Sequence, residues 1–169
     1  MARLKYSPSG VVAKMTTIGL ALALPLIPGT IMAQEHPLSA PLTVTETQGG
    51  VAGETGTVWA IAPDYSFTVA RRIGLKVLDP HKHGHLALKQ SARLGELLDR
   101  MVKTGFQSPL APPPQANPHR ITLSYGSRQL VLTLPPGGGD IGALRASTGD
   151  ERTKSILDLT AAVKDMLGR

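Results

Sequence analysis

The fold is decided by Leu42-Thr43-Val44-Thr45-Glu46-Thr47-Gln48-Gly49-Gly50-Val51-Ala52-Gly53, which leads into Gly56-Thr57-Val58-Trp59-Ala60-Ile61. In both runs apolar residues alternate with small or polar ones, which is typical of strands that bury one face. Three glycines among residues 49–53 leave little side chain, and glycine adopts backbone conformations that other residues avoid. The pattern predicts two strands joined by a glycine-rich turn. Because a partner can closely approach bare backbone, a contact loop is the alternative interpretation.

Further strands and two helices follow this turn. Helical spacing of Leu94, Leu97, Leu98 and Met101 predicts one helix, and a stripe of apolar residues after Glu151 predicts another. Gly126-Ser127 between two alternating runs suits a type II′ hairpin turn. The expected strands are residues 42–47, 57–62, 65–71, 75–78, 120–125 and 128–134, and the first helix is 86–104. This order predicts an α+β fold, a small antiparallel sheet with two helices packed on one face, as a single domain over residues 42–168.

The first 33 residues have the order of a secretory signal peptide. The basic residues at its start are Arg3, Lys5 and Lys14. A mostly apolar run over residues 15–27 follows, and Ala33 is a small residue suited to the position before a cut. The run is shorter than the roughly 20 residues of a membrane span. We expect cleavage near Ala33, a flexible leader over 34–41 and a periplasmic or secreted product without a membrane anchor; an uncleaved N-terminal anchor is the alternative.

Charge and composition narrow the classes of partner. The chain has 18 Lys and Arg and 12 Asp and Glu, and three of the basic residues lie in the predicted signal, so the mature charge is 15 − 12 = +3. This charge is modest, and no dense basic patch is interleaved with aromatics, so we expect no nucleic-acid partner. Cysteine is absent, which excludes disulfides and cysteine-based zinc sites. The sequence does not indicate the oligomeric state.

A histidine cluster, His81-Lys82-His83-Gly84-His85, raises the question of a metal. In an extended segment His81, His83 and His85 point the same way, and imidazole suits zinc, copper or nickel. His119 could join them from a loop, whereas Lys82 adds a repelling charge. Two interpretations stay open: a solvent-exposed polar loop, or the metal site of a periplasmic metal-binding or metal-handling protein.

Motifs for catalysis or for a cofactor are not found in this sequence. The glycines of Pro135-Pro136-Gly137-Gly138-Gly139-Asp140 lack the Gly-Lys-Ser/Thr ending of a phosphate-binding loop. Serine, histidine and aspartate all occur, but in no nucleophile-elbow pattern. We therefore expect a protein that is not an enzyme, has no catalytic residues and needs no cofactor.

The stretch Gln48-Gly49-Gly50-Val51-Ala52-Gly53 resembles the Gly-Gly-apolar-Ala-Gly signature of emfourin-like proteins. The order that follows is also similar: a helix ending at Gly105-Phe106, a proline-rich loop, a hairpin containing residues 121–126, and a C-terminal helix. The resemblance covers about residues 42–167. It implies a small α+β protein that inhibits protealysin-like, thermolysin-type zinc metallopeptidases by binding them.

The resemblance carries five positions over as partner-binding residues: Gly49, Gly50, Val51, Ala52 and Gly53. The chain departs from the family at three points. The family commonly has Phe at the position of Val51. The segment between the glycine motif and the first helix is longer here by about one hairpin, and the family's members mostly lack an obvious export signal.

Overall fold

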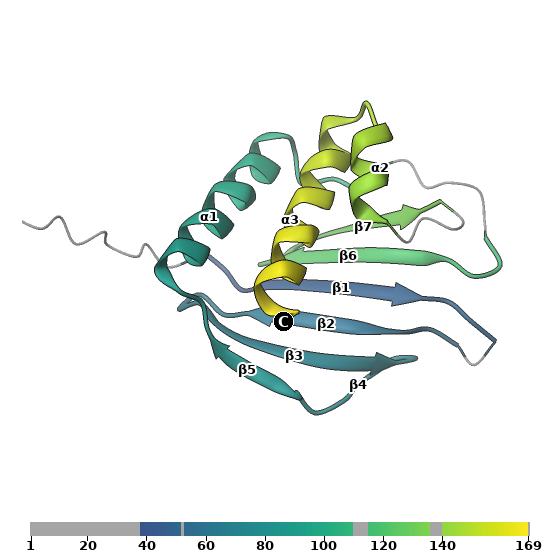
Figure 1. Cartoon of the computed structure of the whole chain (residues 1–169), viewed down its shortest axis with the longest axis horizontal. Helices are drawn as coiled ribbons and strands as arrows, with labels where there is room; N and C mark the ends of the chain where they lie inside the picture. The colour runs from purple at the N-terminus through teal and green to yellow at the C-terminus, as the bar shows by residue number, and fades with distance from the viewer. Residues whose placement is uncertain (1–37, 52, 110–114, 136–139, 169) are drawn as a thin grey trace, which may run out of the picture. The chain divides into compact units, whose positions relative to one another are not determined.

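The structure, a computed structural model, describes residues 38–51, 53–109, 115–135 and 140–168. The predicted signal peptide, residues 34–37 of the predicted leader and Ala52 lie outside the described residues. Seven strands and three helices form in the described part (Figure 1). They are β1 (Leu42–Gln48), β2 (Thr55–Ile61), β3 (Ser66–Ile73), β4 (Lys76–Val77), β5 (Lys82–His85), α1 (Leu88–Lys103), β6 (His119–Tyr125), β7 (Arg128–Leu134), α2 (Ile141–Ser147) and α3 (Glu151–Leu167).

The strands form one antiparallel sheet in the order β4-β3-β2-β1-β6-β7, and β5 also pairs with β3. β1 lies at the centre, with β2 on one side and β6 on the other. Val44 lies opposite Trp59 of β2 and opposite Leu123 of β6, so these pairs show the register of the three central strands. One edge of β1 therefore pairs with a strand that lies far along the chain.

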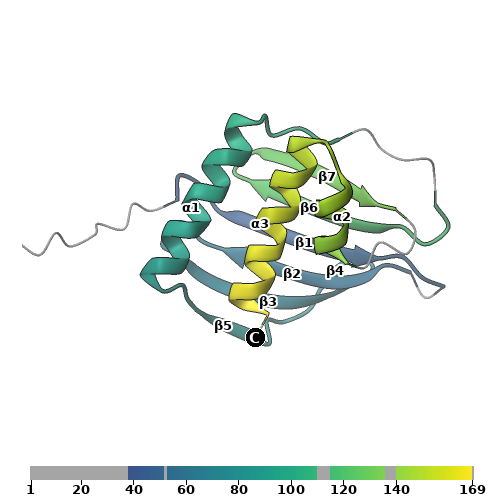
Figure 2. The same cartoon turned by 45° about the horizontal axis from the view of Figure 1, so that its top comes forward.

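One face of the sheet carries the core, and the helices cover it (Figure 2). Alternation along β1 turns Leu42 and Val44 toward this face, where both are fully buried. Trp59, which pairs with Val44, is buried on the same face. The helices contribute apolar residues such as Leu94, Leu98, Met101, Ile156, Leu159 and Val163. The predicted α+β fold with helices on one face of an antiparallel sheet is confirmed.

The opposite face of the sheet carries small residues. Cross-strand pairing brings Thr45 beside Val58 on one side and beside Thr122 on the other. Further members of this face are Thr43, Thr47, Ala60, Thr68, Ala70 and Ser124. No helix of the described part covers this face (Figure 2).

Two elements were not predicted, and one boundary moves. The segment expected to be a polar loop contains β5, whose sequence Lys-His-Gly-His has no apolar residue to reveal a strand. Helix α2 is capped by Asp140, whose Oδ1 accepts hydrogen bonds from the N–H groups of Gly142 and Ala143 at 2.8 and 3.2 Å. This helix buries only Ile141, so it has no apolar period to recognise. The packed domain also extends to Leu38, which is buried and lies four residues before the predicted boundary at 42.

The predicted helix and hairpin ends are confirmed where glycine sets them. Gly105 has φ of 87° directly after the last turn of α1, as expected for a glycine that ends a helix. Gly126 has φ of 60° in the two-residue turn between β6 and β7, which fits the expected type II′ turn. The N-cap of α3 is Asp150, whose side chain accepts hydrogen bonds from the N–H groups of Arg152 and Thr153.

Candidate functional site

Two turns meet at one end of the sheet, and we call residues 49–51, 53–54 and 73–77 together the loop end. The first is the glycine loop between β1 and β2, and the second is the turn Gly74-Leu75 between β3 and β4 (Figure 1). The N–H of Gly74 donates to the carbonyl of Glu54 at 2.6 Å. Thr55 at the start of β2 also pairs with Ile73 at the end of β3. The two turns are therefore held side by side by backbone contacts.

The glycines of the loop have different structural roles. A Cβ on Gly49 would lie 2.7 Å from Cδ of Pro118, so this position accepts no side chain without movement of its neighbour. Gly53 has φ of 96°, in the left-handed region that glycine favours, and its N–H donates to the carbonyl of Gly50 at 3.0 Å. Gly50 itself has no positive φ, and a Cβ there would meet only Gly53 O, at 3.7 Å. The fold thus requires glycine at 49 and 53 but leaves position 50 open.

Val51 stands at the tip of this loop with a relative exposure of 109%. An apolar side chain that the fold leaves in water contributes no burial energy to folding. Its burial against a partner would be favourable. The bare positions Gly50 and Gly53 on either side leave room for such a partner. Of the five positions that the resemblance carried over, four lie in the described part and cluster here; Ala52 lies outside it.

The turn beside the glycine loop exposes more apolar surface. Leu75 is 95% exposed, and Ile73 and Val77 are half exposed. The sequence predicted a short strand over 75–78, so Leu75 was not expected to be presented at a turn. The pair Gly74-Leu75 could have indicated this turn, because a glycine at the first position of a two-residue loop is typical of a type II′ turn. In the structure Gly74 has φ of 58°.

An ionic cluster supports the loop end from the helix side of the sheet. The Nε2 atom of His119 lies 2.9 Å from Oε1 of Glu46, and Nζ of Lys164 lies 2.6 Å from Oε2 of the same carboxylate. Glu46 and His119 are only 15% and 16% exposed. The cluster joins β1, β6 and α3 just before the glycine loop begins. Gln48 Nε2 adds a hydrogen bond to the carbonyl of Asn117 at 3.2 Å, so the base of the loop is fixed.

The histidine cluster is not gathered into a metal site. His83 and His85 belong to β5, where they pair with Thr68 and Ser66 and lie on the face without helices. Alternate residues of a strand are about 7 Å apart, so His81 and His85 are too distant to share one ion. His119 lies in β6, which β1, β2 and β3 separate from β5. Within the described part of the chain, no three His, Cys, Asp or Glu residues are placed to hold a metal.

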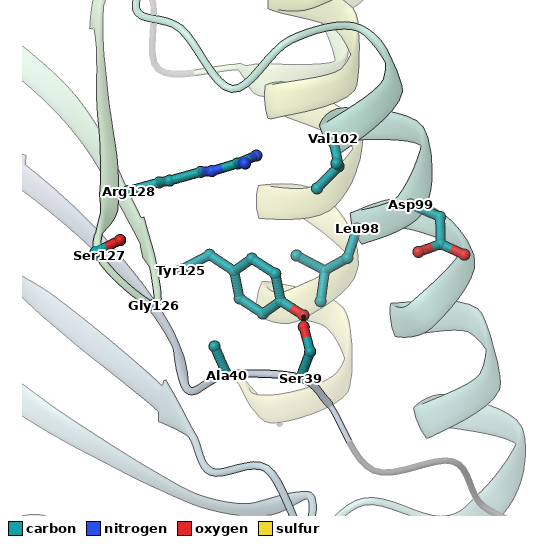
Figure 3. Close-up of a pocket in the computed structure, with 9 residues that line it drawn as sticks. All are labelled: Ser39, Ala40, Leu98, Asp99, Val102, Tyr125, Gly126, Ser127 and Arg128. Carbon is teal, nitrogen blue, oxygen red and sulfur yellow. Dashed lines mark hydrogen bonds between the residues drawn. The ribbon is translucent and has the colours of Figure 1, made fainter.

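A hollow of about 370 Å³ lies near the opposite end of the sheet, between α1 and the β6–β7 turn (Figure 3). Its lining residues are Ser39, Ala40, Leu98, Asp99, Val102, Tyr125, Gly126, Ser127 and Arg128. Ser39 Oγ and the hydroxyl of Tyr125 are 2.7 Å apart, and Arg128 extends across the hollow toward Val102. The bond between Ser39 and Tyr125 joins the segment before β1 to the end of β6.

Comparison with known proteins adds no assignment to this geometry. No model of a protein family matches the chain, and no curated protein matches it. Across the residues that the structure describes, no helix is both long and apolar enough to cross a membrane. The loop end is therefore the candidate site on its geometry alone.

Proposed function

We propose that this chain is an exported, non-catalytic binding protein, most concretely a proteinaceous inhibitor of a thermolysin-like or protealysin-like zinc metallopeptidase. The observation that carries the proposal is Val51, a fully exposed apolar residue at the tip of a glycine loop. The resemblance of Gly49-Gly50-Val51-Ala52-Gly53 to the emfourin-like signature supplies the class of partner.

The physical basis is a preorganised apolar anchor. Burying a valine side chain in a partner's pocket contributes about 1.5–3 kcal/mol. The residues that contribute most to binding lie in well-packed, desolvated pockets of an interface, and an exposed side chain at a loop tip is placed to enter such a pocket. The hydrogen bonds from Gly49 N–H to Pro118 O and from Gly53 N–H to Gly50 O, at 2.8 and 3.0 Å, hold the loop before any partner arrives. Less conformational freedom is then lost on association, and more of the burial energy appears as affinity.

The test is titration of the purified mature chain into several thermolysin-like metallopeptidases, with a peptide substrate as reporter. We expect inhibition at micromolar concentrations or below, and loss of inhibition in Val51→Asp. Leu88→Asp is the matched control, because Leu88 is also an exposed apolar residue but lies at the start of α1. Failure of the unchanged chain to inhibit any of these peptidases would remove the proposal.

A further inference from the structure

We infer that the β3–β4 hairpin forms the second half of the contact surface, and that this surface fits a protein partner whose apolar depression is bordered by acidic groups. The inference rests on the proposed function, because it names the chemistry of the partner at the same site. The sequence resemblance did not point to this hairpin. It follows from the placement, exposure and charge of residues 71–77.

Placement makes the two turns one surface. The glycine loop joins β1 to β2, and the Gly74-Leu75 turn joins β3 to β4 at the same end of the sheet. Neighbouring strands are about 4.8 Å apart, so the midlines of the two hairpins lie about 10 Å apart across the sheet. The bond from Gly74 N–H to Glu54 O ties the second turn to the base of the glycine loop. A protein partner that covers Val51 and the base of this loop also reaches Leu75.

Exposure singles out this end of the molecule. Seven large apolar residues of the described part are exposed, and four of them lie at the loop end: Val51, Ile73, Leu75 and Val77. Single exposed apolar residues are ordinary, whereas a group of them on one surface indicates an interaction site. Val51 and Leu75, the two most exposed, are also the two at turn positions.

Charge indicates the character of the partner. Arg71 and Lys76 are exposed, and neither has an ion-pair partner within the described part of the chain. The only acid within residues 49–54 and 71–77 is Glu54, and Arg120 pairs with it at 2.5 Å. Arg72 is bound locally, since its Nε donates to the carbonyl of Gly74 at 2.8 Å. Two unpaired cations beside an apolar tip complement a partner with carboxylates around its apolar depression.

A lipid surface is the competing occupant, because exposed apolar turns beside cations can also bind anionic membranes. Interfacial membrane contacts are rich in the aromatic residues tryptophan, tyrosine and phenylalanine, and also in leucine. The loop end contains Leu75 but none of the three aromatic residues. Trp59 and Tyr65 are buried elsewhere, and Phe67 covers Gly84, where a Cβ would lie 2.9 Å from the ring. A protein pocket suited to two aliphatic side chains is favoured.

The experiment measures binding kinetics with a metallopeptidase that the unchanged chain inhibits. We expect Leu75→Ser to weaken binding about tenfold, mainly through faster dissociation. We expect the double variant Arg71→Glu, Lys76→Glu to slow association about tenfold or more at low salt, with the difference shrinking as salt is added. The matched controls are Leu88→Ser and the double variant Lys89→Glu, Arg93→Glu on α1, which should bind like the parent. Thermal melts confirm folding, and Val77→Ser replaces Leu75→Ser if that variant melts early.

Each other outcome has a distinct meaning. Inhibition by the parent with unchanged binding of the hairpin variants overturns this inference and leaves the proposed function standing. No binding by the parent to any metallopeptidase overturns both. The same proteins are also mixed with vesicles of phosphatidylglycerol and phosphatidylcholine. Binding to these vesicles that Leu75→Ser abolishes assigns the surface to membranes and overturns the protein partner.

Discussion

Gly49 lies directly against Pro118. Its N–H donates to the carbonyl of Pro118 at 2.8 Å, and a Cβ on Gly49 would stand 2.7 Å from the proline Cδ. The contact ties the base of the glycine loop to the segment that enters β6. Gly50, the next residue, has no comparable neighbour among the described residues, since Gly53 O at 3.7 Å is the nearest atom to its added Cβ. Adjacent glycines of one motif therefore differ, because a side chain at position 49 would disturb the fold whereas position 50 has room for one.

Gly49→Ala is expected to destabilise the domain. The new methyl must displace the ring of Pro118, and overpacking of this kind costs about 1–3 kcal/mol. Urea denaturation of the parent, Gly49→Ala and Gly50→Ala measures the effect. Gly50→Ala is the matched control and should unfold at nearly the parent midpoint; equal midpoints for all three proteins would contradict the structural role of Gly49.

Gly50→Val is expected to separate the contact from the fold. Position 50 has no positive φ and faces open space, so the melting temperature should stay near that of the parent. If the loop docks on a peptidase, the branched side chain should raise the inhibition constant. The two quantities are measured on the same preparation. A destabilised variant that inhibits normally when folded would show that Gly50 shapes the turn and that the contact lies elsewhere.

Gly56→Ala is expected to be more damaging than any substitution in the loop. A Cβ at this position of β2 would lie 2.0 Å from the carbonyl oxygen of Glu46 in β1, so the central strands could not keep their spacing. We expect a loss of at least about 3 kcal/mol in unfolding free energy, within the range of severe core changes. Gly95→Ala in α1 is the control: its Cβ meets no described atom within 4 Å, and removing a mid-helix glycine should stabilise by about 0.5–1 kcal/mol.

Acid stability is expected to depend on Asp150, which caps α3. The hydroxyl of Thr153 donates to its Oδ2 at 2.6 Å and, with the Thr153 N–H, lowers the pKa of Asp150 from its ordinary value of 3.8. A lowered folded pKa gives stability that is present above the unfolded pKa and is lost as pH falls through the folded one.

Asp150→Ala should therefore cost about 1 kcal/mol at neutral pH, the usual value of a lost cap. Its unfolding free energy should also fall less steeply than that of the parent below pH 3.8. Asp150→Asn keeps an accepting oxygen, so it should lose the pH dependence but retain part of the cap. Parallel curves for parent and both variants would show that the carboxylate is not linked to folding.

Replacing His81, His83 and His85 together by alanine is expected to leave zinc binding unchanged. No three ligand residues of the described part are placed around one ion, so the parent should bind zinc weakly and the variant equally so. Calorimetric titration with zinc and with copper measures both proteins. Tight binding by the parent that the triple variant loses would revive a metal site built from these histidines.

The sequence predicted the strands and helices that have an apolar period. Leu42 and Val44 in β1, and Leu94 and Leu98 in α1, bury one side each, and burial on one side is what creates a readable alternation. The edge strand β5 pairs through its backbone and buries none of its own residues, so no pattern marks it. The prediction of a strand at Leu75 was wrong because this apolar residue continues the strand pattern of its neighbours, yet it lies in a turn and is exposed.

The order of the strands could not be predicted from local patterns. Nothing in residues 42–48 indicates that their second neighbour is residues 119–125 rather than another strand. That choice depends on how the whole core packs under α1 and α3. Only part of the candidate site could be predicted. The glycine motif is visible in the sequence, but the sheet order is needed to show that the β3–β4 hairpin lies beside it.

The central position of β1 has a consequence for how the chain is made. Its pairing with β6 joins residues separated by 119 − 48 = 71 to 125 − 42 = 83 positions, whereas its pairing with β2 is local. During synthesis, β1 can pair with β2 at once, but the backbone groups on its other edge stay without strand partners until β6 emerges. An open strand edge of this kind recruits other chains. Holding chaperones should therefore bind nascent chains that end before residue 119 and release those that extend past β7.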